Sequence, residues 1–136
     1  MSTAVRAPGT EMTDAQPREV VADVLDRWKA AIEAHQPQHV AALFAEDAIF
    51  QGLRPYGVGR QAIADYYDAQ PHGLTPTYRI LETREPAEGV VLGYAGVDFA
   101  FTDRSTIPVL LGVLLTRAGD GWLIAHYQAS PLPDAS

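Results

Sequence analysis

The first candidates for chemistry are polar residues that alternate along an apolar segment near the C-terminal end. A strand over Trp122–Ser130 would carry Trp122, Ile124, His126, Gln128 and Ser130 on one side and Leu123, Ala125, Tyr127 and Ala129 on the other. His126 is the only histidine within a predicted strand. Because a neutral imidazole exchanges a proton near neutral pH, we predict that His126 is a catalytic acid or base. The alternative is a core histidine bonded to a tyrosine or to the backbone.

Asp98 is the second candidate, because it is the one carboxylate in the middle of an apolar strand-like segment, Val97–Phe101. Burial there would raise its pKa and make it a usable acid or base. The alternative is that Asp98 faces solvent near the strand end or pairs with Arg79 or Arg104. Tyr94, four residues earlier, would share its face of the strand.

Several further side chains are predicted to bind a substrate. Trp28, Tyr66 and Tyr67 would stack on an aromatic or otherwise apolar molecule. Arg79 or Gln128 would stabilise negative charge that develops on it, and Tyr94 would line the same site.

Composition argues against several other kinds of site. The chain has no cysteine, and Pro37 interrupts the helical spacing that His35 and His39 would need to bind one metal ion, so we predict no metal. No dinucleotide-binding fingerprint is present, and we expect no cofactor. With 17 acidic and 10 basic residues the net charge is -7, which disfavours nucleic acid as a partner.

The candidate residues need a scaffold, and the first half of the chain predicts helices. Apolar residues recur at three- and four-residue steps from Val21 to Ile32, which indicates a long amphipathic helix that starts between Thr13 and Arg18. Pro37 breaks it. A short second helix is expected to carry Val40, Leu43 and Phe44 inward, and a strand begins at Ala48. After a loop, Arg60–Gln70 forms the third helix.

The second half of the chain predicts strands joined by tight turns. The expected strands are Thr77–Glu85, Val90–Phe101, Pro108–Arg117 and Trp122–Ser130, with a hairpin turn at Glu88-Gly89. The connections are short, so the sheet is predicted to be largely antiparallel and curled around the long helix. The fold class is α+β, with an apolar chamber between helix and sheet, floored by Trp28 and walled by the strand that bears His126.

One strand carries a signal about assembly. Val109–Leu115 is a continuous apolar run, whereas a strand with one wet face should alternate apolar and polar residues. Because the helices cover only one face of the sheet, we expect a second copy of the chain to cover the other face in a two-fold dimer.

The order of these elements, together with particular residues, resembles a known family. The matching features are Trp28 with Ala30-Ala31, Ala42–Ala48 leading into a strand, Gly59-Arg60 opening a helix, and the last strand Trp122–Ser130. In these features the chain resembles the SnoaL-like branch of the nuclear transport factor 2-like superfamily, and within it the SgcJ/EcaC-type proteins. The resemblance covers roughly residues 20–132. It implies a cone-shaped, cystatin-like fold, a homodimer, and activity without a cofactor.

The resemblance also limits the chemistry. Where relatives often have two histidines, this chain has His126 and Gln128, which weakens any mechanism that needs a histidine pair. Laid on ketosteroid isomerase, a relative of this fold, the tyrosine position is Trp28, the aspartate base is Gly52, and Ser105–Gly119 contains no acid for the second hydrogen-bond donor. Isomerisation by that mechanism is not expected.

These observations predict one SnoaL-like domain at 15–133, a disordered leader at 1–14 and a tail at 134–136. The leader has no signal-peptide pattern and no segment is long and apolar enough for a membrane span, so a soluble cytoplasmic protein is expected, with no membrane partner. The predicted function is a small-molecule pocket protein of secondary metabolism. It would be a proton-transfer, cyclase or isomerase enzyme acting on an aromatic or polyketide-like molecule; the alternative is a non-catalytic protein that binds or sequesters such a molecule.

Overall fold

A long amphipathic helix opens the fold. The computed structural model describes residues 15–132, and helix α1 spans Ala15–Glu33, as the apolar spacing predicts. The buried stripe consists of Val21, Val24, Leu25, Trp28, Ala31 and Ile32. On the opposite side Asp23 and Arg27 form an ion pair at 3.3 Å, one helical turn apart. The expected leader at 1–14 and the tail at 134–136 lie outside the described residues.

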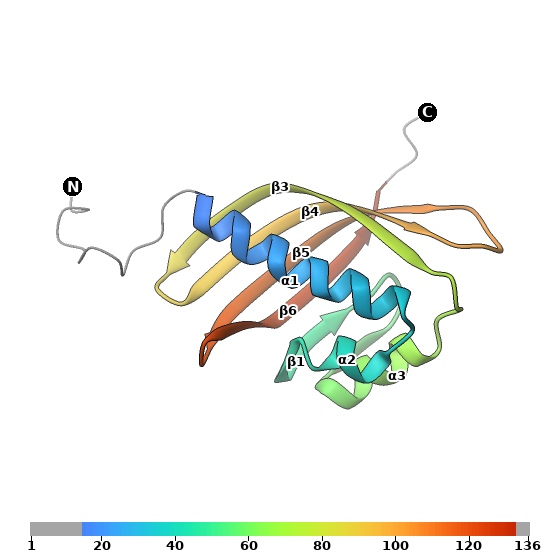
Figure 1. Ribbon diagram of the computed structural model, residues 1–136, viewed down its shortest axis with the longest axis horizontal. Coiled ribbons are helices and arrows are strands. Elements are labelled where there is room, and N and C mark those ends of the chain that lie inside the picture. Colours follow the sequence, from blue (N-terminus) through green and yellow to red (C-terminus); the bar gives the residue numbers. More distant parts are fainter. Residues whose placement is uncertain (1–14, 133–136) are drawn as a thin grey trace.

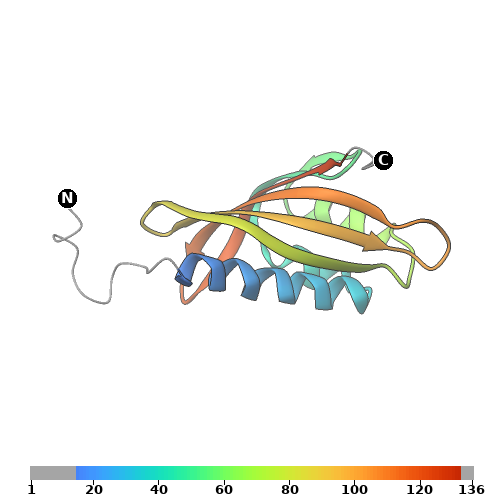
Figure 2. The ribbon, with the colours of Figure 1, turned by 90° about the horizontal axis from the view of Figure 1, so that it is seen from above.

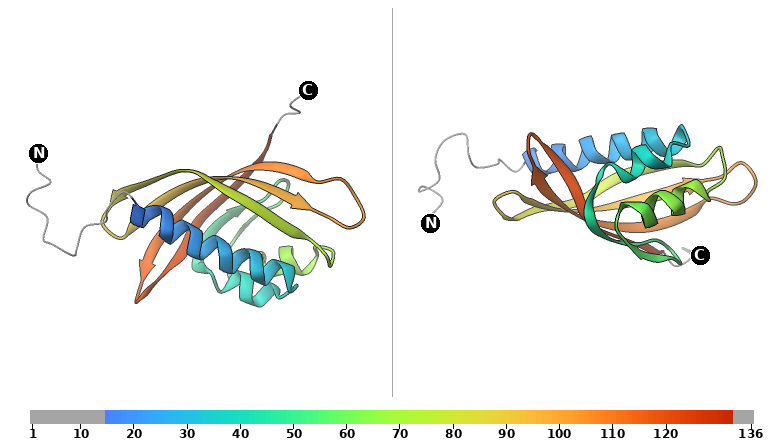
Figure 3. Two further views of the ribbon diagram at one scale, coloured as in Figure 1. Left: turned by 45° about the horizontal axis from the view of Figure 1, so that its top comes forward. Right: turned by 90° about the horizontal axis from the view of Figure 1, so that it is seen from below.

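Two short helices follow near the C-terminal end of α1 (Figure 3). His35 has a φ of 51°, a left-handed conformation that stops α1, and Pro37 then starts α2 (Pro37–Ala41) at a position where its missing N–H costs nothing. Helix α3 spans Arg60–Asp68 and buries Ile63, Ala64 and Tyr67.

One curved sheet of six strands forms the other layer. The strands are β1 (Phe44–Gln51), β2 (Tyr56–Val58), β3 (Thr75–Ala87), β4 (Val90–Ala100), β5 (Ile107–Ala118) and β6 (Gly121–Pro131). Their order is β2-β1-β6-β5-β4-β3, and only β1 and β6 pair in parallel. Helix α1 crosses one face of the sheet (Figure 1), and seen from above it runs along that side (Figure 2). The predicted α+β fold with a curved, mainly antiparallel sheet is confirmed.

Two details differ from the sequence-based expectation. Strand β1 begins at Phe44, which we expected in the second helix, because Phe44 pairs with Ile124 of β6 and the Ile124 N–H donates to the Leu43 carbonyl at 2.9 Å. Residues 56–58, expected in a loop, form the short edge strand β2 against Ile49–Gln51. Both differences arise from pairing between distant segments, which no local pattern encodes.

The core lies between α1 and the concave face of the sheet. On β4 and β5 the inward residues are Val91, Ala95, Val97, Val109, Leu111, Val113 and Leu115, all buried. Helix α1 approaches β4 closely at Gly93, where an added Cβ would lie 2.8 Å from Val21 Cγ2. No helix among residues 15–132 is long and apolar enough to cross a membrane.

Candidate functional site

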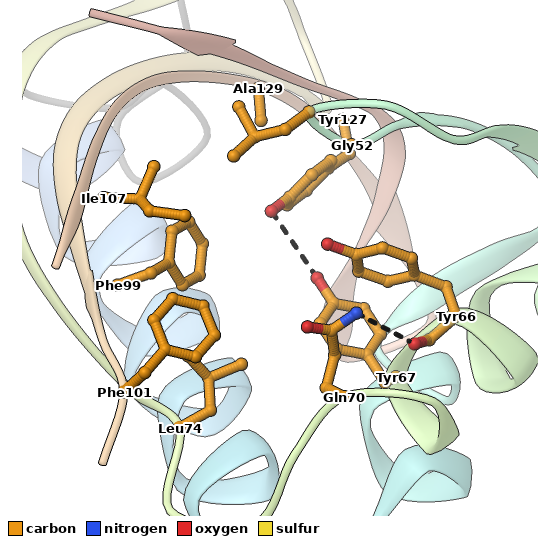
Figure 4. A pocket seen from close by; sticks show the side chains of 11 residues that line it. Gly52, Tyr66, Tyr67, Gln70, Leu74, Phe99, Phe101, Ile107, Tyr127 and Ala129 are labelled. Atoms are coloured by element: carbon orange, nitrogen blue, oxygen red, sulfur yellow. Dashed lines mark hydrogen bonds between the residues drawn. The ribbon is translucent and has the colours of Figure 1, made fainter. Parts of the chain in front are cut away.

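A small aromatic pocket opens between α3 and the concave face of the sheet. Figure 4 shows three tyrosines and Gln70 on one side and apolar side chains on the other. The cavity is about 30 Å³ and is lined by Gly52, Leu53, Tyr66, Tyr67, Gln70, Leu74, Phe99, Phe101, Ile107, Tyr127 and Ala129. Among these lining residues there is no acid, no base and no histidine.

Hydrogen bonds link the polar groups at the back of this pocket. The Trp28 Nε1–H donates to the Tyr67 hydroxyl at 3.1 Å, and the Tyr67 and Tyr127 hydroxyl oxygens are 3.5 Å apart. Aromatic rings hold the groups in place: Phe50 stacks on Tyr127 with a centroid distance of 4.6 Å, and Phe99 meets Trp28 edge to face at 5.9 Å. Trp28 lies behind the tyrosines and does not itself line the cavity.

Burial determines the protonation of these tyrosines. Loss of solvent raises the pKa of the Tyr67 hydroxyl well above its ordinary value, and the nearby Tyr66 adds to the effect. Burial also raises the pKa of Tyr127 and that of Tyr66, although Tyr66 is less deeply buried. The three hydroxyls are therefore neutral hydrogen-bonding groups at neutral pH and not bases.

His126 lies on the face of the sheet opposite this pocket. The prediction that His126 lines the inner chamber is therefore wrong. The pairing of β5 with β6 shifts between Leu114 and Leu115, which leaves Ala125 as an extra, bulged residue. Ile124 before the bulge and Tyr127 after it both point to the core. Strict alternation would place Ile124 and His126 on one side, but the bulge turns His126 outward.

Gln128 and Tyr94 also lie on this outer face. Together with His126 they line a hollow of about 160 Å³ whose other residues are Leu92, Leu110, Gly112 and Ser130. Tyr94 pairs with Gly112 across β4 and β5, and its ring covers that glycine, since an added Cβ there would lie 3.1 Å from the ring. The structure thus brings His126, Gln128 and Tyr94 together, but away from the inner pocket.

Asp98 and Arg79 form a third, separate group on the outer face. Arg79 Nη1 and Asp98 Oδ2 are 4.0 Å apart, and their side chains are 61% and 47% exposed. Asp98 therefore pairs with Arg79 near the strand end, which is the alternative given for it above, and it is not the buried carboxylate that the sequence predicts. Asp98 shares its face with Tyr94, as alternation predicts.

The histidines at the helix corner do not form a metal site. His35 stacks on His72 with a centroid distance of 3.9 Å, and His39 Nδ1 contacts Gln36 Oε1 at 2.9 Å. Within residues 15–132 no group of three or more His, Asp or Glu side chains is arranged to hold a metal ion.

Of the predicted substrate-binding residues, the inner pocket contains Tyr66 and Tyr67, with Trp28 one hydrogen bond behind them. Sequence reasoning missed Gln70, Phe99, Phe101 and Tyr127. A signal for them exists: Phe99 and Phe101 alternate with Asp98, and Tyr127 alternates with polar His126 and Gln128. The more apolar set of each strand faces the core.

Comparisons with known proteins agree with this architecture. A family model described as a SnoaL-like domain matches residues 21–135. No curated protein is significantly similar in sequence.

Solved structures with the same fold share few residues with this chain. A cystatin-like domain of unknown function from Nostoc punctiforme has a TM-score of 0.76 and 17% identity, over 90% of this chain and 82% of that chain. A putative calcium/calmodulin-dependent protein kinase II association domain from Xanthomonas campestris has a TM-score of 0.75 and 20% identity, over 96% of this chain and 95% of that chain. A ketosteroid isomerase-like protein from Erwinia carotovora atroseptica has a TM-score of 0.68 and 18% identity, over 85% and 96%.

The family model spans most of the chain. At these identities the solved structures establish the fold and not an activity. The protein belongs to the SnoaL-like domain family.

Proposed function

We propose that this protein binds a small, flat, apolar molecule in the inner pocket and does not transform it. The observation that carries the proposal is the lining of that pocket: aromatic and aliphatic side chains with a few tyrosine hydroxyls and one amide. Such a lining suits an aromatic or polyketide-like molecule of secondary metabolism, the kind of ligand that the family resemblance to SgcJ/EcaC-type proteins suggests.

Binding is preferred over catalysis because the lining residues of the pocket include no histidine and no carboxylate to transfer a proton near neutral pH. His126 and Asp98, our candidates for that role, lie on the other face of the sheet. Tyr67 and Tyr127 are protonated at neutral pH, and burial raises the pKa of both hydroxyls further, so neither gives up its proton readily. An enzyme of the proton-transfer, cyclase or isomerase type is the second candidate, favoured by the range of activities that this family includes.

The size of the pocket restricts how a ligand enters. A cavity of about 30 Å³ has room for water, whereas pockets that enclose organic ligands measure roughly 300–1,000 Å³. The half-buried side chains Leu53, Tyr66 and Phe101 therefore have to move outward when a ligand binds. Side-chain rotation of this kind is common on binding.

We also propose that two copies of the chain associate through the outer face of the sheet. Ile49 is 44% exposed and Tyr94 is 42% exposed on that face, beside the half-buried Leu92, Leu110 and Leu114. A surface this apolar is typical of an interface. The similarity to a structure titled as a putative association domain supports assembly by this fold.

The ligand proposal is tested with a single-tryptophan protein. The chain has two tryptophans, so Trp122→Phe leaves Trp28, which touches the pocket tyrosine Tyr67, as the only indole reporter. We expect ethylbenzene to change the Trp28 fluorescence in a saturable way, and the molecule recovered after incubation to be unchanged by mass spectrometry.

Two neighbouring substitutions on β6 locate the ligand. Ala129 lines the inner pocket, so Ala129→Leu should fill the pocket and abolish binding. Ser130 lines the outer hollow, so Ser130→Leu should leave ligand binding unchanged. The opposite pattern would move the ligand to the outer hollow. A product that forms with the parent protein and is lost with His126→Ala would establish the enzyme instead.

A further inference from the structure

Three buried polar groups from three elements meet at the back of the inner pocket. Trp28 of α1 is 0% exposed, Tyr67 of α3 is 5% exposed and Tyr127 of β6 is 2% exposed. The indole N–H contacts the Tyr67 hydroxyl at 3.1 Å, and the Tyr67 and Tyr127 oxygens lie 3.5 Å apart. The three groups therefore form an unbranched chain of two contacts.

A count of hydrogens leaves one donor unused. The indole N–H only donates, while each tyrosine hydroxyl has one hydrogen to donate and two lone pairs to accept. The chain thus holds three hydrogens and uses two: the indole hydrogen on Tyr67, and one hydroxyl hydrogen between the tyrosines. Whichever tyrosine donates to the other, one hydroxyl hydrogen of the pair remains. Within residues 15–132 neither hydroxyl has a further hydrogen-bond partner.

Both tyrosine hydroxyls lie at the cavity, so it offers room for an acceptor of the unused hydrogen. Tyr67 and Tyr127 both line the pocket, and their hydroxyls point toward its interior (Figure 4). Tyr66 adds a third hydroxyl at the same side, while the Gln70 amide nitrogen is directed to the Tyr66 backbone carbonyl at 3.4 Å. A buried donor without an acceptor costs free energy, and a ligand or a water molecule that accepts its hydrogen removes that cost.

Charge decides which acceptor fits. No lysine, arginine or histidine is among the lining residues, so a carboxylate or phosphate would be buried here without a counter-ion. A neutral oxygen avoids that penalty. Phe99, Phe101 and Ile107 form the facing wall and fit an apolar ring.

We propose that the Tyr67–Tyr127 hydroxyl pair selects ligands that carry a neutral carbonyl oxygen on a flat apolar body. The inference rests on the proposed ligand-binding function and adds the functional group that the pocket recognises. Trp28 lies behind the pair, and its N–H occupies one lone pair of Tyr67 but offers no acceptor for the remaining hydroxyl hydrogen.

The experiment compares two molecules of similar shape, acetophenone and ethylbenzene, which differ by the carbonyl oxygen. We expect acetophenone to bind about fivefold more tightly. We also expect its carbonyl stretching band in the complex to lie at lower frequency than in an apolar solvent, because a hydrogen bond weakens the C=O bond.

Variants identify the donor. Tyr127→Phe alone frees the hydrogen of Tyr67, so the double variant Tyr67→Phe with Tyr127→Phe is needed to remove the preference. Because the Tyr66 hydroxyl also lines the pocket, Tyr66→Phe is compared with it and should keep the preference. Tyr56→Phe, at a tyrosine that is 70% exposed, is the matched control and should keep it. If the double variant does not fold, the comparison of the two molecules on the parent protein and the carbonyl band still decide the question.

Each failure has its own signature. Equal binding of both molecules, with an unshifted carbonyl band, would overturn this inference and leave the ligand-binding function standing, with an ordered water taking the hydrogen. Failure of both molecules to bind would overturn the proposed function and this inference with it.

Discussion

The chemistry of the inner pocket is set by tyrosines, which are neutral donors that only become bases at high pH. Tyr66, Tyr67 and Tyr127 lie around one cavity, and burial raises the pKa of each hydroxyl. The pKa of Tyr78 on β3 is raised as well, by burial and by its hydrogen bond to Asp26. These shifts make the free energy of unfolding depend on pH in the alkaline range.

The sign of that dependence follows from linkage. In the unfolded chain a tyrosine loses its proton near pH ~10, whereas in the folded chain these four keep theirs to higher pH. Their stabilising contribution is complete below pH ~10 and is lost as pH rises through the folded pKa values. We expect urea midpoints to fall steadily above pH ~10, and much of the tyrosinate absorbance change to accompany unfolding.

A matched variant tests the assignment of this alkaline effect. The double variant Tyr67→Phe with Tyr127→Phe lacks two of the four hydroxyls, and its stability should fall less steeply with pH than that of the parent. A parent protein whose urea midpoint stays level as pH rises past ~10 would contradict the raised pKa values.

At the scale of elements, the position of α1 on the sheet depends on a missing side chain. Val21 lies in the space over Gly93 that a β-carbon would occupy, at 2.8 Å from the added atom. Such a contact is shorter than van der Waals packing allows, so the helix and the strand would have to separate.

The bulge at Ala125 is a second element-level feature, because it decides which residues of β6 face the core.

Gly93→Ala is therefore expected to destabilise the protein by about 1–3 kcal/mol through overpacking. Gly121→Ala is the matched control, because an added Cβ there meets nothing within 4 Å, and it should cost little. Adding Val21→Ala to Gly93→Ala should recover part of the loss in a double-mutant cycle measured by urea unfolding. Equal stability of Gly93→Ala and Gly121→Ala would contradict the close approach of α1 to β4.

At the scale of the molecule, helices cover one face of the sheet, and residues 15–132 leave the other face uncovered. The uncovered face combines apolar residues of β1, β4 and β5 with the polar hollow around His126. The proposed dimer would bury this surface, because apolar area removed from water stabilises association.

Leu114 on β5 lies next to His126 of β6 in the middle of this face. Light scattering of the parent protein at micromolar concentration should give twice the 14.7 kDa chain mass. The variant Leu114→Glu should give the mass of the monomer, because the new carboxylate would be buried in the interface and would add to a net charge of -7. Ala118→Glu, at the exposed end of β5, should remain dimeric. A monomeric parent protein would refute the dimer.

The sequence by itself determined the layers and most of the elements, but not the start of β1 or the edge strand β2. Helical spacing located α1, Pro37 located its end, and turn residues separated four strands within one or two residues of their observed bounds. These features are local, because periodicity and turn chemistry act over a few neighbouring residues. Family membership also followed from residue types at these positions.

Only the tertiary structure decided where the candidate residues point. One unpaired residue, Ala125, reverses the alternation of β6, so His126 and Gln128 face outward and Tyr127 faces the pocket. Whether a strand contains a bulge depends on its partner across the sheet, and Leu114 and Leu115 are too far along the chain from Ala125 for a local pattern to report it. For the same reason the contact of Trp28 with Tyr67, 39 residues apart, is a property of the folded chain alone.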